Sequence, residues 1–158
     1  MTTMTMDLAP APAPAPAGPA PAHQLRDVFQ RSAALIAERG WCRGAELHYV
    51  GNSHDPEAAS LGGALQWAAT GHAELPDQVS RQALSLLRDR IDPDRKAPFD
   101  DWELFCAWND SPSRTRAQTI ALLISARNAV ERSGSSANLT YPRPLPGHLV
   151  QVPIARRI

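Results

Sequence analysis

The residues with the most distinctive chemistry are the Trp108-Asn109-Asp110 turn and the nearby Arg114. In a functional interpretation, Asn109 and Asp110 are polar groups at the mouth of a pocket, beside the guanidinium of Arg114. In a structural interpretation, Trp108 anchors the turn in the core and one side chain caps the next helix: Asp110, Ser111 or Ser113. A capping oxygen accepts a hydrogen bond from a free backbone N–H and contributes about 0.5–2 kcal/mol, which explains the turn without chemistry. The helix cap is therefore favoured, with the pocket as the alternative.

Four tryptophans in a small domain could also form a stacking cage for a ligand: Trp41, Trp67, Trp102 and Trp108. Three of them lie at expected helix ends or on apolar stripes, which assigns them to the core. Trp67 differs, because it lies about 120° around its helix from the apolar stripe of that segment. It either broadens the stripe or stands exposed at an interface. Trp67 therefore joins the candidate functional surface with Trp108, Asn109, Asp110 and Arg114.

The histidines, cysteines and serines form no recognisable metal or catalytic pattern. His48, His54 and Asp55 share one loop and Cys42 would complete a ligand set on paper, but zinc requires three or four ligands on rigid elements. The chain has no G-x-S-x-G or S-x-x-K motif to mark a nucleophile, and Gly62-Gly63 is too short for a phosphate loop. We predict no catalytic, cofactor-binding or metal-binding residue. A small enzyme with its site at the Trp108-Asn109-Asp110 turn is the weakest alternative.

The charge is unevenly distributed although sixteen basic and sixteen acidic residues cancel overall. Residues 1–110 carry a net charge of −6, and residues 111–158 carry +6. A basic carboxyl-terminal strip could bind the phosphates of a nucleic acid through Arg114, Arg116, Arg127 and Arg132. The same arginines could instead be solvated or pair internally with a group of aspartates: Asp89, Asp92, Asp94, Asp100 and Asp101. Because the chain is neutral and carries no nucleic-acid motif, internal pairing or solvation is favoured and nucleic-acid binding is the runner-up.

The elements that would position these residues lie between two proline-containing ends. Residues 1–22 hold six of the fifteen prolines, mostly alternating with alanine, which excludes a helix or ladder strand and predicts a disordered, extended arm. Residues 134–158 are predicted to form an irregular, disordered tail punctuated by prolines. Residues 23–133 are long enough to bury one hydrophobic core, so the expected organisation is a single domain with two unstructured ends.

The apolar periodicity within that core is helical. It predicts a first helix that buries Leu25, Val28, Phe29, Ser32, Leu35 and Ile36, ending at Gly40 in a left-handed conformation with Trp41 folded back onto Ile36. Four further helices are expected at about 60–70, 76–91, 99–108 and 113–132. The last is apolar nearly all round, which is typical of the buried centre of a domain. One extended piece at 46–50 makes no sheet, so the predicted fold is a mainly α bundle of about five helices.

Three short motifs occur in order along this core: Gly40-Trp41-Cys42-Arg43-Gly44, Gly63-Ala64-Leu65 and Trp108-Asn109-Asp110 followed by Arg114-Thr115. The set resembles a family of small actinobacterial and phage-borne proteins of unknown function, whose pattern is Gly-Trp-x-x-Gly, Cys-x-x-Gly-Ala-Leu and Trp-Asn-Asp before Gly-Arg-Thr. Ser60 stands where the family pattern has cysteine, and Ser113 stands where it has glycine. The resemblance implies a fold but no activity.

These observations together predict a cytoplasmic, single-domain helical protein that acts as a non-enzymatic protein-interaction or regulatory module. Its expected partner is another protein, and no apolar run approaches the roughly 18 residues that a membrane span requires. The runner-up is a nucleic-acid-associated protein that uses the four arginines named above.

Overall fold

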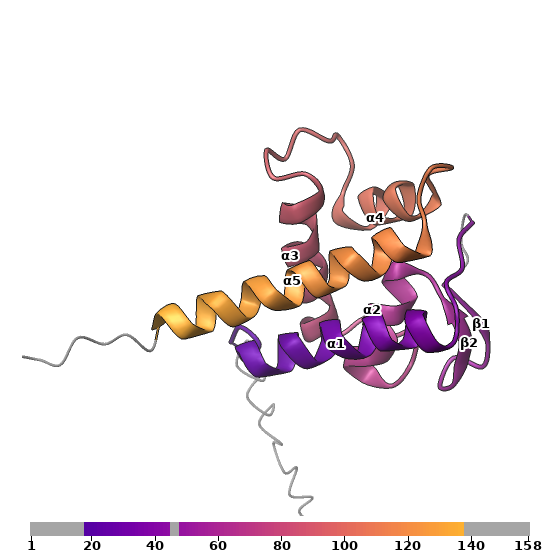
Figure 1. Cartoon of the computed structure of the whole chain (residues 1–158), viewed down its shortest axis with the longest axis horizontal. Helices are drawn as coiled ribbons and strands as arrows, with labels where there is room; N and C mark the ends of the chain where they lie inside the picture. Colours follow the sequence, from indigo (N-terminus) through magenta and orange to yellow (C-terminus); the bar gives the residue numbers. More distant parts are fainter. Residues whose placement is uncertain (1–17, 45–47, 138–158) are drawn as a thin grey trace, which may run out of the picture.

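The computed structural model describes residues 18–44 and 48–137, which form five helices and one antiparallel pair of strands (Figure 1). The helices are α1 (Ala22–Glu38), α2 (Leu61–Thr70), α3 (Gln78–Ile91), α4 (Asp101–Asp110) and α5 (Arg116–Ala137), and the strands are β1 (Tyr49–Gly51) and β2 (Pro56–Ala59). The prediction of a mainly α fold with about five helices is confirmed. Most of the predicted arm and tail lie outside the described residues. No helix within the described residues combines the length and apolarity that crossing a membrane requires.

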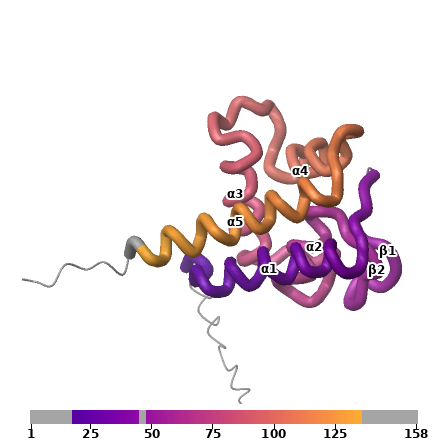
Figure 2. The backbone as a smooth tube through the Cα atoms, viewed as in Figure 1, coloured from indigo at the N-terminus to yellow at the C-terminus, as the bar shows by residue number. Residues whose placement is uncertain are grey.

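Helices α1 and α5 run antiparallel along each other and form the longest seam of the molecule (Figures 1 and 2). The stripe predicted for α1 is buried: Leu25, Val28, Phe29, Ser32, Leu35 and Ile36. On α5 the buried positions are Thr119, Leu123, Ala126 and Val130, at helical spacing. Burial of each large apolar side chain contributes about 1.5–3 kcal/mol, so this seam and the underlying α2 and α3 supply most of the core.

The position of α5 corrects one expectation. Its Ile120-Ala121-Leu122-Leu123-Ile124 run does not pass through the centre of the domain, because only Leu123 is fully buried and Ala121 is exposed. The helix also begins and ends later than predicted, at Arg116 and Ala137. Its first turn is closed by Thr115 and Gln118: the Gln118 backbone N–H donates to Thr115 Oγ1, and the Thr115 N–H donates to Gln118 Oε1. The predicted caps, Asp110, Ser111 and Ser113, are therefore wrong.

The sequence pattern does not indicate the strand pair that the structure contains. Tyr49 pairs with Ala59 and Val50 with Ala58. Trp41, which follows α1, forms a further parallel bridge with Ala59 of β2. The Cys42 N–H donates to the Ala59 carbonyl at 3.1 Å, and the Ala59 N–H donates to the Gly40 carbonyl at 3.1 Å. These backbone bonds fix the Gly-Trp-x-x-Gly segment against the residues that lead into α2.

Gly40 does not adopt the left-handed conformation that was predicted for it. The positive-φ glycines of the described chain are Gly44, Gly51 and Gly71. Gly40 instead lies close to β2: a Cβ there would lie 3.0 Å from Ala58 Cβ and 3.3 Å from the Glu57 carbonyl oxygen, so a side chain would make β2 shift by a few tenths of an ångström. Gly71 is the residue that ends a helix, α2, in the left-handed region.

Helices α3 and α4 both begin with a capping box. Asp77 accepts from the Ser80 N–H, and Asp100 accepts from the Glu103 N–H. Since α4 extends to Asp110, the Trp108-Asn109-Asp110 sequence is the last turn of a helix and not a free turn. This placement directs Asn109 toward the interior, where it is 4% exposed.

Candidate functional site

The side chain of Asn109 joins three separate segments of the chain. Its Oδ1 accepts a hydrogen bond from Trp41 Nε1 at 2.8 Å and a second from the Leu61 backbone N–H at 3.1 Å. Its Nδ2 donates to the Cys42 carbonyl at 3.2 Å and to Asp110 Oδ1 at 2.9 Å. The amide thus uses both lone pairs and both hydrogens. It satisfies the first free N–H of α2 and the indole of Trp41 at once.

Asp110 and Arg114 are held close to the same junction. Asp110 Oδ1 accepts from the Gly44 backbone N–H at 2.9 Å, which ties the end of α4 to the end of the Gly-Trp-x-x-Gly segment. The Arg114 guanidinium lies 3.7 Å from the centroid of the Trp108 ring, and its Nε donates to the Trp108 carbonyl at 3.2 Å. Cation–π stacking of this kind contributes about 0.5–2 kcal/mol. Trp108, Asn109, Asp110 and Arg114 therefore lie close together, with Asn109 buried.

The glycines of α2 allow other segments of the chain to approach its first turn closely. A Cβ at Gly63 would lie 1.9 Å from the His48 carbonyl oxygen, and a Cβ at Gly62 would lie 2.7 Å from Cζ3 of Trp102. The first turn of α2 is capped by Ser60, whose Oγ accepts from the Gly63 N–H at 3.2 Å. Ser60 therefore acts as a helix cap. The three motifs separated in sequence meet at one place.

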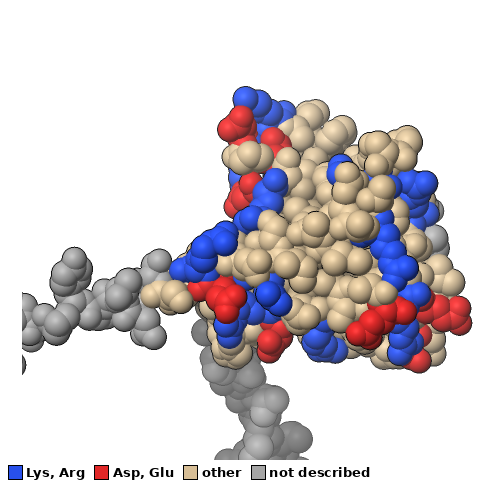
Figure 3. Space-filling model, viewed as in Figure 1, with Lys and Arg blue, Asp and Glu red and all other residues tan. Residues whose placement is uncertain are grey.

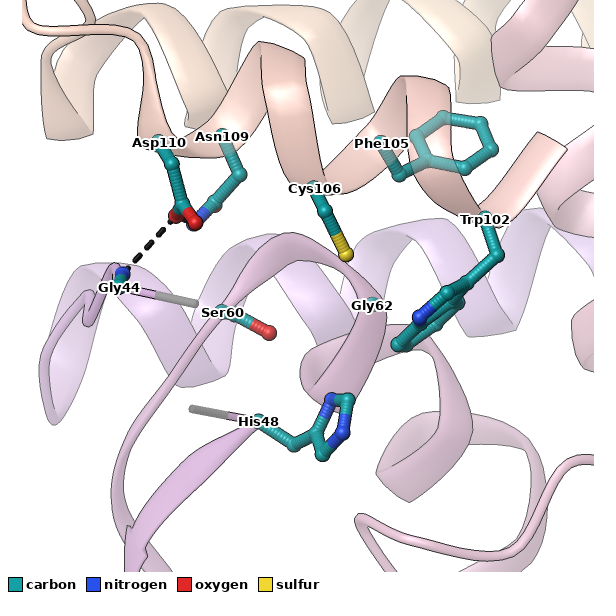
Figure 4. A pocket seen from close by; sticks show the side chains of 9 residues that line it. All are labelled: Gly44, His48, Ser60, Gly62, Trp102, Phe105, Cys106, Asn109 and Asp110. Carbon is teal, nitrogen blue, oxygen red and sulfur yellow. Dashed lines mark hydrogen bonds between the residues drawn. The ribbon is translucent and has the colours of Figure 1, made fainter. Parts of the chain in front are cut away.

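A small pocket lies beside the junction, between α4 and the first turn of α2 (Figure 4). Figure 4 shows Cys106 pointing into it from α4, with Ser60 and His48 on the opposite side and Trp102 closing one end. The space inside is about 20 Å³. A site of that size holds about one water molecule, so the pocket next to Asn109 and Asp110 is too small for an organic substrate.

Both thiols of the chain lie near this pocket and are poor nucleophiles. Burial, followed by the negative charge of Asp110, raises the pKa of Cys42 to about 11. Burial also raises the pKa of Cys106, and the charges of Asp110 and Asp100 add to the effect. Because the thiolate is the reactive form, neither cysteine is activated at neutral pH.

Trp67 lies apart from this cluster, toward the carboxyl end of α2. Its indole Nε1 donates to the His54 carbonyl at 2.9 Å, and the Arg31 guanidinium lies 5.0 Å from the centroid of its ring. The ring is partly buried, so it broadens the apolar stripe of α2 as well as facing Arg31. The structure does not bring Trp67 together with Asn109.

The arginines proposed for nucleic-acid contact make protein contacts of several kinds. Arg116 donates to the Ala37 carbonyl at the end of α1, and Arg127 donates to Gln30 Oε1 on the same helix. Arg114 stacks on Trp108 as described, and Arg132 also has an interaction partner. On the face drawn in Figure 3, basic side chains surround a broad uncharged centre, and acidic side chains lie beside several of them.

The aspartates expected to pair with these arginines have other partners. Asp89 pairs with Arg95 at 2.7 Å, Asp94 with Lys96 at 2.8 Å and Asp101 with Arg88 at 2.6 Å. Asp100 caps α4, and Asp92 accepts from the backbone N–H groups of Lys96 and Ala97, which lowers its pKa. The aspartates suggested as partners of Arg114, Arg116 and Arg127 are therefore wrong, although all three arginines contact other groups of the chain.

His54, in the loop between α1 and α2, contacts His72, which follows α2. His54 packs edge-on against His72, with ring centroids 4.5 Å apart, and His72 Nε2 lies 3.1 Å from Ser53 Oγ. Within residues 18–44 and 48–137, no three His, Cys, Asp or Glu side chains come together as metal ligands.

The fold and the junction define a small helical domain in which three short motifs meet through one buried asparagine. The chain belongs to a family of unknown function, DUF6197, whose model matches residues 20–129. The resemblance inferred from the three motifs is thereby confirmed at the level of a family without an assigned activity. Neither a curated protein nor a solved structure matches the chain.

The sequence pattern predicts that Trp41 packs on Ile36 and does not indicate its hydrogen bond to Asn109. The Gly-Trp-x-x-Gly pattern was a usable signal, because an indole N–H at a helix end needs an acceptor when it is partly buried. What the pattern lacks is the identity of that acceptor, which lies 68 positions away at Asn109.

Proposed function

We propose that this protein is a non-enzymatic interaction module that binds a helical segment of a partner protein. The polar residues of the motifs support a binding role over catalysis. Asn109 makes four internal hydrogen bonds, Asp110 holds Gly44, and the adjoining pocket has room for about one water molecule. These groups are used to hold the fold together.

The observation that carries the proposal is a groove at the opposite end of the domain, where α1, α3 and α5 meet. It has a volume of about 470 Å³. Its walls are mainly small and apolar: Ala20, Ala22, Leu25, Leu86, Ala126, Ala129 and Val130. Side chains this small allow the backbone of another chain to approach closely, as in helix–helix packing.

An amphipathic helix fits this groove better than an extended peptide. Three helices bound the groove and, among the described residues, no strand lines it, so a fourth helix would continue the bundle. The rim carries both signs of charge, with Asp89 and Arg90 on α3. Helix-in-groove recognition uses apolar anchors on one helix face with polar residues at the edge, and this lining matches that mode.

The experiment is affinity capture with two matched variants of α5. Ala129→Arg places a long cation in the groove, whereas Ala121→Arg makes the same change at an exposed position of the same helix that does not line it. We expect a partner that is captured by the wild type and by Ala121→Arg to be lost with Ala129→Arg. We also expect the segment of the partner that can be cross-linked to the groove to be helical. Melting curves of both variants establish that they are folded. Capture that is equal for all three proteins contradicts the proposal.

A further inference from the structure

A second, larger groove lies between α2, α3 and α4, and it shares no residue with the groove proposed above for a partner helix. Its volume is about 720 Å³, within the range typical of small-molecule sites. His48 and Trp102 line both this groove and the small pocket beside Asn109, so their two rings form the wall between them. Figure 4 shows the two rings side by side below α4.

The side-chain amide of Gln66 is the unusual feature of this groove. Gln66 lines it from α2 and is only 6% exposed. Among the described residues, no group forms a hydrogen bond with its amide, whereas the amide of Asn109 is fully bonded. Among the described residues, Arg88 Nε is the one side-chain nitrogen or oxygen that is both inaccessible to solvent and without a hydrogen bond. The unbonded Gln66 amide is therefore accessible to solvent at the groove surface. The donor and the acceptor of this amide are therefore both available in the groove to a ligand that bonds to them in place of water.

The rest of the lining favours a flat ring beside that amide. The Trp102 ring packs against the backbone of Gly62, and its centroid lies 5.0 Å from that of His48 at an angle of 43°. Leu84, which is 7% exposed, adds an apolar surface. Aromatic side chains bind planar ligands by stacking, and every nucleobase has a suitable face.

The charges around the groove leave one cation without a partner. Asp101 is paired with Arg88, and Glu74 accepts the hydroxyl hydrogen of Tyr49 at 2.7 Å. Arg81 lines the groove, is exposed, and has no ion pair or side-chain hydrogen bond with any residue in the described part of the chain. A single available guanidinium at the edge suits one phosphate group.

We propose that this groove binds an adenine nucleotide with a single phosphate. The amide of Gln66 accepts from the N6 amino group and donates to N7, a pairing that adenine allows because these atoms lie side by side. Guanine presents two acceptors, O6 and N7, on the same edge, so one end of the amide would be left unpaired. The ring stacks beside Trp102 and His48, and Arg81 contacts the phosphate.

The test is a calorimetric titration of the full-length protein with AMP, GMP and adenosine. The wild type is expected to bind AMP at least about tenfold more tightly than GMP. Gln66→Leu, which is close in volume and has no polar group, is expected to weaken AMP binding by about tenfold or more while melting at the same or a higher temperature. Gln24→Leu, at an exposed position on α1 with no side-chain hydrogen bond among the described residues, is the matched control and should leave AMP binding unchanged.

A second variant separates the two ends of the ligand. Arg81→Gln should weaken the binding of AMP severalfold and leave the binding of adenosine unchanged, because only AMP carries the phosphate. The proposal is overturned if AMP shows no saturable binding up to millimolar concentration, if AMP and GMP bind equally, or if Gln66→Leu binds AMP as the wild type does. The comparison of AMP with GMP uses the unmodified protein and does not depend on the folding of any variant.

Discussion

Trp41 donates its indole N–H to the side-chain oxygen of Asn109 across 68 positions of sequence, at 2.8 Å. The bond joins the segment that follows α1 to the last turn of α4. The same oxygen also accepts the first free N–H of α2, so three elements depend on one amide. This arrangement joins the Gly-Trp-x-x-Gly and Trp-Asn-Asp motifs directly, and it joins them to the start of α2 through Leu61, two residues before the Gly-Ala-Leu motif.

The glycine of the second motif should be intolerant of any side chain. A Cβ at Gly63 would lie 1.9 Å from the His48 carbonyl oxygen, so the backbone of α2 or of the segment before β1 must move. We expect Gly63→Ala to lower the free energy of unfolding by about 3 kcal/mol or more. Chemical denaturation measures the change.

Gly134 on α5 is the matched control for that substitution. A Cβ there meets nothing closer than Ala22 Cβ at 3.9 Å, and the residue is helical. Gly134→Ala should therefore raise the free energy of unfolding by about 0.5–1 kcal/mol, since alanine favours the helix. Equal effects of the two substitutions would mean that the contact with His48 is unimportant.

The amino-terminal cap of α5 is Thr115, and its removal should destabilise the fold. Thr115→Ala removes the oxygen that accepts the Gln118 N–H and should cost about 1 kcal/mol. Ser113→Ala, at an exposed position two residues earlier, should change stability by less than about 0.5 kcal/mol. Thermal denaturation of both variants distinguishes them, and a larger loss for Ser113→Ala would restore the cap expected from the sequence.

Local patterns made most of the helical prediction possible. The buried stripe of α1, from Leu25 to Ile36, can be predicted from the spacing of apolar residues alone. The acidic residues expected at the start of α4 include Asp100, which forms its capping box. The errors arose where distant segments decide the structure. The conformation of Gly40 is set by β2, and β2 itself, Pro56–Ala59, contains no β-branched residue that would indicate a strand.

The sequence predicts the part of the candidate site whose residues are close together along the chain. Trp108, Asn109, Asp110 and Arg114 are close in sequence, and the structure keeps them together. The partners that determine what they do, Trp41, Leu61 and Gly44, come from elsewhere in the chain. Gln66 had no sequence signal, because a glutamine in a helix is ordinary until its surroundings show that it is buried and unpaired.

Cys42 should become reactive at a higher pH in the folded protein than in the unfolded protein. Its folded pKa of about 11 exceeds the value of about 8.5 expected for an unfolded thiol, so the protonated thiol is favoured by folding. The contribution of the protonated Cys42 thiol to the free energy of unfolding is therefore fully present below about pH 8.5. It is lost as the pH rises toward 11.

Alkylation by iodoacetamide measures this shift when Cys106→Ser leaves Cys42 as the single thiol. At pH 8.5 we expect the native protein to react roughly a hundredfold more slowly than the same protein in denaturant, because its thiolate fraction is smaller. The denatured protein is the control. A native rate that reaches half its maximum near pH 8.5 would show that burial and Asp110 do not perturb the thiol.

The claim that the motifs form one junction is tested most directly by a double-mutant cycle between Trp41 and Asn109. Trp41→Phe removes the indole N–H and keeps an aromatic ring, and Asn109→Ala removes its acceptor. Asn109→Ala alone should cost about 2 kcal/mol or more, since it leaves the Trp41 and Leu61 N–H groups without a partner. The free energies of unfolding of the four proteins should give a coupling energy of about 1 kcal/mol or more. Additive losses, with a coupling energy near zero, would contradict the junction and show that the two residues stabilise the fold independently.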